Sequence, residues 1–402
     1  MVVDTIVILL QAPLLALAAF LAFYVLVVTV APLVIPAKPK PAVATRKKFA
    51  IIIPAHNEEK VIEKTLHSVF RVDYPRELYD VIVVADNCTD HTARIALECG
   101  AIVFQRNDPV RRGKGYALNW ITPQVLERLP APGYDACIFM DADSVMMPSF
   151  LDEMNRSLHQ GHRVIQSSDL VLENSTSWRV QLILIAFALQ NYVRLLGKSR
   201  LGFSVLLKGN GMCFDASLLR TVKWDESSLG EDLDMGIDLI RRGEKIYFNP
   251  DAVVYALMPE QASSATTQRM RWEGGRFASL RRRVPKLLRE AWQKKSLALF
   301  EAAIDAAYPP LAIMLLVSAA FALINYGLLS AGIIGNATIF GGWVAVLGMI
   351  TLHCLFGLMV ARIRFRNMLA LLYVPRYLLW KLRVYLAMLI GHTQKGWVRT
   401  ER

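Results

Sequence analysis

The chain has few cysteines, and its longest hydrophobic runs contain no Asp, Glu, Lys or Arg. Only five of its 402 residues are cysteine, and their spacing is not that of a metal site. We therefore interpret them as reduced structural residues. The charge-free runs lie at 5–35, about 306–329 and 338–361. A transporter is expected to carry charged groups inside its spans, so their absence argues against a transport path.

The three runs predict an integral membrane protein. Hydrophobic residues make up 54% of the chain and the mean hydropathy is +0.33, which is too apolar for a purely soluble enzyme. Each run is long enough to cross a bilayer. The first run exceeds the length of a signal-peptide core and lacks a preceding basic segment, so we interpret it as a span. We place one transmembrane helix within 1–36 and two within 300–362.

Basic residues mark the margins of the membrane runs. They gather at 40–48, at 281–295 and at 362–366. The positive-inside rule therefore places the central segment and the tail in the cytoplasm, beneath the inner or plasma membrane. The part of the tail at 366–391 is apolar but contains four basic residues, which favours an interfacial helix within 363–402 over a fourth span. The net charge of +12 would also suit nucleic acid, but its location favours an anionic lipid bilayer as the partner, with no nucleic acid.

The central segment reads as one α/β domain at about 48–290. Apolar β-rich runs alternate with helical periodicity, and this alternation predicts a parallel sheet flanked by helices. We see no internal repeat and no low-complexity linker. The expected strands are 49–54, 81–85, 101–105 and 136–140, and the expected helices are 58–70, 89–99, 116–129 and 233–242.

Polar clusters follow the predicted strands, where open α/β sheets bind ligands. Asp141 and Asp143 come directly after an apolar run. Their hard carboxylate oxygens suit Mg²⁺ or Mn²⁺ shared with a diphosphate, although Asp-x-Asp by itself is common in turns. Further clusters lie at 54–59, 86–90 and 111–115. Each alone fits ordinary turn chemistry, but together they suggest a nucleotide site.

Two more motifs lie in the second half of the domain. Glu231, Asp232 and Asp234 occupy the first turn of a predicted helix, where the helix dipole alone favours acidic residues, so spacing does not single out one of them. Gln268 and Trp272, with Arg271 between them, share one face of a helix. These groups could hold a diphosphate and stack on a sugar, or form an interfacial helix anchored by the indole.

Taken in order, these motifs resemble those of the membrane-embedded family 2 glycosyltransferases, which include the cellulose, chitin, hyaluronan and poly-N-acetylglucosamine synthases. The resemblance covers about residues 48–290. It implies a cytoplasmic α/β catalytic domain of the GT-A (Rossmann-like) fold and an inverting hexosyltransferase that uses a nucleotide-diphosphate sugar, usually UDP-linked, with Mg²⁺ or Mn²⁺. The matching segments are Pro54-Ala-His-Asn-Glu58, Asp86-Asn-Cys-Thr-Asp90, Lys114 to Asn119, Asp141-Ala-Asp143, Gly209-Asn-Gly211, Glu231-Asp232 and Gln268-Arg-Met-Arg-Trp272.

The resemblance also implies roles for single residues. Asp232 would be the catalytic base, and Asp143 would bind the metal with help from Asp141. The donor would be held by Pro54, Glu58, Asp86, Lys114, Asp141, Gln268 and Arg271. The acceptor would meet Gly209, Asn210, Glu231 and Trp272.

Two departures from the family pattern leave alternatives open. The acidic motif begins with Gly230 where many relatives have threonine, and only two spans follow the domain, fewer than in cellulose synthases. A processive polymerase, a single-sugar transferase acting on a lipid-linked acceptor and an inert nucleotide-binding membrane protein all remain open. So do the sugar, the acceptor, and a homo-oligomer or export partner.

The basic margins make a testable prediction about topology. A reporter inserted near Lys40 and one fused after Arg402 should both read cytoplasmic, whereas a reporter near Ser330 should read external. Alkaline phosphatase and fluorescent protein fusions measure this directly. An external reading at Lys40 would overturn the predicted orientation.

Overall fold

The computed structural model describes residues 2–37, 39–40, 43–128, 133–173, 175, 177–226, 228, 230–258 and 262–389. The side chains of 262–267, 271, 388 and 389 lie outside this description. The predicted role of the Arg271 side chain and the tail beyond 389 therefore fall outside the described residues.

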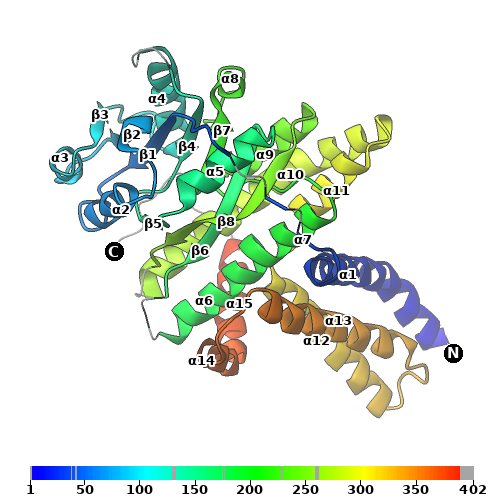
Figure 1. The fold of residues 1–402 in the computed structure, drawn as a ribbon. Coiled ribbons are helices and arrows are strands. Elements are labelled where there is room, and N and C mark those ends of the chain that lie inside the picture. Colours follow the sequence, from blue (N-terminus) through cyan, green and yellow to red (C-terminus); the bar gives the residue numbers. More distant parts are fainter. Residues whose placement is uncertain are drawn as a thin grey trace.

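An eight-stranded sheet forms the centre of the catalytic part (Figure 1). Its strand order is β3-β2-β1-β4-β7-β6-β8-β5. The strands are β1 (Phe49–Ala55), β2 (Tyr79–Asp86), β3 (Ile102–Arg106), β4 (Ala136–Phe139), β5 (Ser144–Met146), β6 (Val164–Val171), β7 (Met212–Asp215) and β8 (Ile246–Ala256). The helices between them are α2 (Ile62–Val69), η1 (Arg76–Leu78), α3 (Thr92–Glu98), α4 (Lys114–Arg128), α5 (Phe150–His159), α6 (Trp178–Phe187), η2 (Ala188–Val193), α7 (Arg194–Arg200), α8 (Ala216–Leu219) and α9 (Glu231–Arg241).

Both faces of the sheet are covered, as the alternation of side chains along β1 shows. Ala50 and Ile52 lie in one hydrophobic core with residues of α4 and α9. Phe49, Ile51 and Ile53 lie in the other core, with residues of α2 and α5. Successive side chains of a strand point to opposite faces, so a continuous apolar run supplies both cores at once.

The expectation of a wholly parallel sheet is wrong in its second half. β1, β2, β3 and β4 are parallel, as predicted. β7, however, lies between β4 and β6 and runs antiparallel to both, and β5 is antiparallel to β8. The helix-rich stretch at 178–200 separates β6 from β7 in the sequence. It packs against β6 on one side and against α13 on the other.

The domain core also continues beyond residue 290. Helix α10 (Ala262–Gln293) is followed by α11 (Leu297–Ala307), and Leu287 and Ala302 lie in the same core as β1. Pro309 and Pro310 separate α11 from the next helix, because proline cannot continue a helix. The second membrane run therefore begins later than the sequence suggested, at Leu311.

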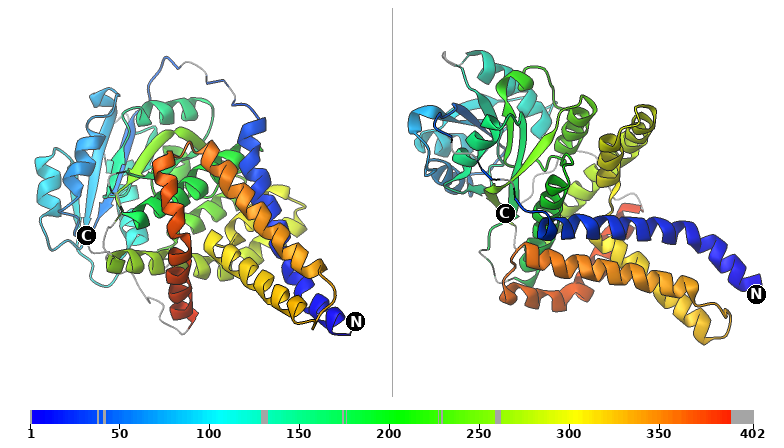
Figure 2. Two further views of the ribbon diagram at one scale, coloured as in Figure 1. Left: turned by 90° about the horizontal axis from the view of Figure 1, so that it is seen from below. Right: turned by 45° about the vertical axis from the view of Figure 1, so that its right-hand side comes forward.

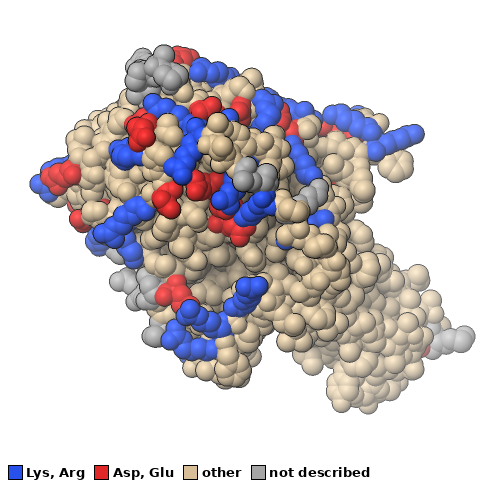
Figure 3. All heavy atoms as spheres, in the orientation of Figure 1, with Lys and Arg blue, Asp and Glu red and all other residues tan. Residues whose placement is uncertain are grey.

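Among the described residues, four helices are long and apolar enough to cross a membrane. Three are the expected ones: α1 (Val2–Val34), α12 (Leu311–Ser330) and α13 (Thr338–Val360). They extend together from the catalytic part (Figure 2), and the surface over them is almost free of charge (Figure 3). The fourth, Trp178–Arg200, was not anticipated, and 78% of its apolar window is buried inside the protein. This burial makes it an internal helix between the sheet and the other three.

Small residues allow these helices to approach closely. A Cβ on Gly197 would lie 1.8 Å from the carbonyl oxygen of Val28, so α7 crosses α1 at backbone contact. A Cβ on Gly342 of α13 would lie 2.5 Å from the side chain of Leu15, so this glycine leaves room for a side chain of α1. Close backbone approach of this kind is the usual basis of helix association in membranes.

The segment after α13 consists of α14 (Phe365–Met368), η3 (Leu369–Tyr373) and α15 (Val374–Leu389). The buried Lys381 joins α15 to Glu273 of α10, with Nζ 2.6 Å from Oε1. Leu379, Leu382 and Leu386 are exposed on α15. An exposed apolar row beside a polar anchor is consistent with the predicted interfacial helix, which stays a prediction.

A buried cluster of charges joins the catalytic part to the membrane helices. Asp305 of α11 pairs with Arg194 and Lys198 of α7, and Lys198 Nζ also lies 3.1 Å from Glu301 Oε1. Tyr24 of α1 donates a hydrogen bond of 2.6 Å to the same oxygen of Glu301. Three elements distant in sequence thus share one set of paired charges.

Removal of one partner should cost stability, because it leaves buried cations without compensation. We expect Asp305→Asn to lower the free energy of unfolding by about 3 kcal/mol. Thermal unfolding in detergent, followed by tryptophan fluorescence, measures the change. The control is Glu98→Gln in the exposed pair with Arg94, which should cost less than about 0.5 kcal/mol. Equal melting temperatures for both variants would contradict the structural role of the cluster.

Candidate active site

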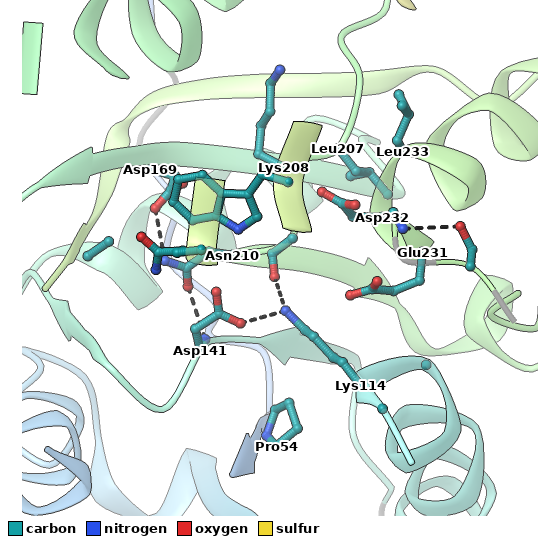
Figure 4. Close-up of a pocket in the computed structure, with 18 of the residues that line it drawn as sticks. Pro54, Lys114, Asp141, Asp169, Leu207, Lys208, Asn210, Glu231, Asp232 and Leu233 are labelled. Atoms are coloured by element: carbon teal, nitrogen blue, oxygen red, sulfur yellow. Dashed lines mark hydrogen bonds and ion pairs between the residues drawn. The ribbon is translucent and has the colours of Figure 1, made fainter. Parts of the chain in front are cut away.

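One cavity of about 710 Å³ collects nearly all of the predicted site residues (Figure 4). It opens along the carboxyl ends of β1, β2 and β4, where an α/β sheet is expected to bind its ligand. The predicted residues that line it are Pro54, Glu58, Asp86, Lys114, Asp141, Asp143, Gly209, Asn210, Glu231, Asp232, Gln268 and Trp272.

Lys114 occupies the centre of the cavity, at the first turn of α4 (Figure 4). Its Nζ donates to Asp141 Oδ1 at 2.5 Å and to the carbonyl oxygen of Gly209 at 2.6 Å. Burial of the amine opposes ionisation, but the charges of Asp141 and Glu231 outweigh it and raise the pKa of Lys114. The side chain is therefore a fixed cation beside the Asp-x-Asp turn, suited to meeting a phosphate.

Asn210 fixes the Asp-x-Asp turn from the opposite side. Its Oδ1 accepts from the backbone N–H of Asp141 at 3.1 Å, and its Nδ2 donates to Ser144 Oγ and Asp169 Oδ1, each at 2.9 Å. Burial raises the pKa of Asp169 to about 8, against the opposing effect of the Asn210 hydrogen bond. Asn210 therefore positions the carboxylates through the backbone and not only by lining the cavity.

Glu231 and Asp232 enter the cavity from the first turn of α9. Burial and the neighbouring charge of Asp232 raise the pKa of Glu231 to about 7, and burial also raises the pKa of Asp232. Asp232 lies against Gly209, where a Cβ would stand 3.2 Å from Oδ2. Gly209 adopts φ +81°, so glycine here satisfies both the backbone conformation and the close approach of the carboxylate.

The carboxylates of Asp141 and Asp143 fit a divalent cation that is shared with a substrate. Among the described residues no group of three or more His, Cys, Asp or Glu side chains could hold a metal by itself. Mg²⁺ is usually held by one or two carboxylates together with substrate phosphates, so two hard oxygen donors at the cavity wall match this mode. One oxygen of Asp141 is bound to Lys114, so Asp141 would offer its second oxygen to the cation beside Asp143.

Asp86 lies at the end of β2 and is already paired. Arg106 Nη1 donates to Asp86 Oδ1 at 2.6 Å, and Asn87 Nδ2 donates to the same oxygen at 3.0 Å. Arg106 also binds the carbonyl oxygen of Arg111 at 2.9 Å, which fixes the loop before α4. A ligand contact by Asp86 would therefore use its second oxygen.

Helix α10 supplies the far wall of the cavity. Gln268 and Trp272 both line it, as their shared helical face predicted. The ring of Trp272 is 5.8 Å from that of Phe187, and the guanidinium of Arg269 lies 5.1 Å from the Trp272 ring centroid. Trp272 is thus held between the fixed ring of α6 and a cation, which leaves it directed at the cavity.

Three further cavity residues were not assigned a role from the sequence: Asp169, Lys208 and Arg276. Asp169 had a detectable signal, because the polar run Gln166 to Asp169 interrupts an otherwise apolar strand. Lys208 directly precedes the Gly209-Asn-Gly211 segment, and Arg276 is one of many basic residues of α10.

Comparison with known proteins identifies the family of the chain. Residues 46–275 match the family described as glycosyltransferase-like family 2. The chain belongs to this family. Two relatives are the probable glycosyltransferase YdaM of Bacillus subtilis, 26% identical over 57% of this chain and 55% of its own length, and the poly-β-1,6-N-acetyl-D-glucosamine synthase of Staphylococcus epidermidis, 26% identical over 58% of this chain and 56% of its own. The chain thus spans a little over half of each relative.

The fold of this glycosyltransferase also has a solved counterpart. The mannosyltransferase PcManGT of Pyrobaculum calidifontis, solved with GDP-Man and Mn²⁺, aligns with a TM-score of 0.52 at 18% identity, over 89% of this chain and 99% of that one. The predicted GT-A fold, with apolar helices added to it, is therefore confirmed.

The raised pKa of Glu231 makes a prediction about stability. A carboxyl that binds its proton more tightly in the folded state stabilises the protein at low pH, and this contribution is lost as the pH rises toward about 7. Between pH 5 and 8 the melting temperature of the wild type should therefore fall relative to that of Glu231→Gln.

The matched control is Glu127→Gln, at an exposed position of α4. Its melting curve should follow the wild type at every pH. If the Glu231→Gln curve is also parallel to the wild type, the carboxyl is not perturbed as the geometry indicates.

Proposed function

We propose that this glycosyltransferase moves a sugar from a nucleotide-diphosphate sugar, with a UDP-sugar as the favoured donor, to a hydroxyl of a saccharide or lipid-linked acceptor. The configuration at the anomeric carbon is inverted. The observation that carries the proposal is the position of Asp232 in the same cavity as Lys114, Gln268 and the Asp141–Asp143 pair. In-line displacement of a diphosphate requires a base, fixed cations and carboxylates that can bind a divalent metal.

In this reaction Asp232 takes the proton of the acceptor hydroxyl as its oxygen attacks the anomeric carbon. The bond between that carbon and the diphosphate oxygen breaks, and the nucleoside diphosphate leaves with the electron pair. A divalent cation, Mg²⁺ or Mn²⁺, would neutralise charge on the diphosphate when bound by Asp143 and Asp141. Lys114 and Gln268 hold the leaving group, and Trp272 offers an apolar surface on which the acceptor sugar stacks.

The remaining assignments follow from this reaction. Pro54, Glu58 and the second oxygen of Asp86 would contact the nucleotide, while Gly209, Asn210 and Glu231 would shape the acceptor side. The basic margins predict a catalytic domain on the cytoplasmic face of the membrane, where it would meet cytosolic nucleotide sugars. The relative named as a polymer synthase supports successive transfers, and a single transfer to a lipid-linked acceptor is the alternative.

A nucleotide-release assay tests the proposal. Purified protein in lipid, with Mn²⁺, is screened against a panel of nucleotide sugars with membrane extract as the acceptor source. At least one sugar should be turned over, and Asp232→Asn should lower its turnover by about 10²-fold or more with UDP binding retained. Product length, measured by mass spectrometry, separates successive from single transfer.

The second variant, Asp143→Asn, separates metal binding from base chemistry. It should weaken Mn²⁺-dependent UDP binding, because a charged oxygen ligand is lost. If the UDP affinity is unchanged, Asp143 is not a metal ligand. Nucleotide binding without turnover of any sugar would instead support an inert binding protein.

A further inference from the structure

The cavity has a second cationic end, formed by Lys208 and Arg276. Both residues line the cavity, and neither has a carboxylate within 4.0 Å among the described residues. Lys208 Nζ has no hydrogen bond or ion pair in that part of the chain, and Arg276 donates from its side chain only to the carbonyl oxygen of Tyr308. Lys208 and Arg276 are half-buried, whereas the fully buried cations nearby are paired: Arg194 and Lys198 with Asp305, and Lys381 with Glu273.

An unpaired ammonium in such a place is costly without a ligand. Burial lowers the pKa of Lys208 to about 8, the positive charges of Arg194 and Arg276 act in the same direction, and Asp305 acts against them. Burial likewise lowers the pKa of Arg276. Two half-buried cations that line one cavity without a carboxylate partner can receive an anion, so an anionic group of a ligand is the expected partner.

This cationic end lies apart from the donor groups. In Figure 4 the side chain of Lys208 points away from the Lys114–Asp141 pair, although its backbone adjoins Gly209 and hence Asp232. An anion held by Lys208 therefore lies on the acceptor side of the base. The donor diphosphate, in contrast, belongs beside Asp141, Asp143 and Lys114.

The same end adjoins the membrane helices. Arg276 binds the carbonyl of Tyr308, three residues before α12 begins, and the ring of Tyr308 is 6.5 Å from that of Tyr24 in α1. Asp305 and Ala306 of α11 complete this wall. A ligand whose anionic group sits here can place an attached hydrocarbon chain along the membrane-facing helices.

Resting on the function proposed above, we propose that Lys208 and Arg276 bind the phosphate of a lipid-diphosphate-linked saccharide, whose sugar hydroxyl is presented to Asp232. The acceptor is then anchored at both ends of one sugar unit. Its hydroxyl faces the base and its phosphate faces the cations, which orients the nucleophile before transfer. A neutral saccharide would lack the second anchor.

Binding of farnesyl diphosphate tests the site without turnover. The protein is placed in discs of neutral phosphatidylcholine and saturated with UDP and Mn²⁺, so that the donor site is already filled. We expect Lys208→Met to raise the Kd of farnesyl diphosphate about 10- to 100-fold, as loss of a charge-assisted hydrogen bond implies, and Lys208→Arg to restore most of the affinity. The control Lys223→Met, at an exposed lysine outside the cavity, should leave it unchanged.

Several outcomes would overturn the inference. They are an unchanged Kd in Lys208→Met, displacement of UDP by farnesyl diphosphate, and equal binding of farnesol. If pyrophosphate binds as tightly as farnesyl diphosphate, the site recognises a free anion and the lipid part of the inference is wrong. If Lys208→Met loses UDP binding and is therefore misfolded, Arg276→Gln serves instead, with the same expected weakening.

The test is separable from that of the proposed function. If the wild-type protein turns over a nucleotide sugar but binds no farnesyl diphosphate, the proposed transferase activity stands and the lipid-phosphate acceptor is wrong. If farnesyl diphosphate binding depends on Lys208 but no nucleotide sugar is turned over, the lipid-phosphate site stands and the proposed transfer reaction is wrong.

Discussion

The buried pairing of Asp305 with Arg194 and Lys198 is the constraint on which the rest of the architecture depends. These charges lie where the sheet domain, the internal helix and the first membrane helix meet, and each would be costly to bury without its partner. Once α11 is fixed to α7, α10 before it and α12 after it have little freedom. This polar contact therefore acts with the close helix crossings and the Lys381–Glu273 pair to position the membrane helices and the far wall of the cavity.

The chemistry of the site follows from where the chain brings its charges. Asp141 and Asp143 end a central strand, Lys114 begins a helix, and Asp232 begins another, so strand ends and helix starts converge on one cavity. Burial then changes what these groups do. Lys114 stays a cation because the charges of nearby carboxylates outweigh its burial. Burial raises the pKa of Glu231 and of Asp232, which makes both carboxylates more basic than exposed acids.

The cavity is also continuous from the sheet edge to the head of the membrane helices. Its lining passes from Pro54 and Lys114 through Asp232 to Asp305 and Ala306. In the proposed reaction, a donor from the aqueous side and a lipid-linked acceptor from the membrane would meet at Asp232 in this cavity. The exposed leucines of α15 and the charge-free surface of α1, α12 and α13 are consistent with the same orientation relative to a bilayer.

The sequence by itself determined the local features: the strands of the first half, the three apolar runs and the polar clusters that carry the family resemblance. Apolar run length and the ends of periodic segments are local properties, so they are readable from neighbouring residues. The tertiary structure alone decided the antiparallel placement of β7, the burial of the fourth apolar helix, and the pairing of Lys114 with Asp141 and of Lys381 with Glu273. It also distinguished Lys208 and Arg276 from the other basic residues, because no carboxylate among the described residues pairs with them, and no residue spacing records such three-dimensional surroundings.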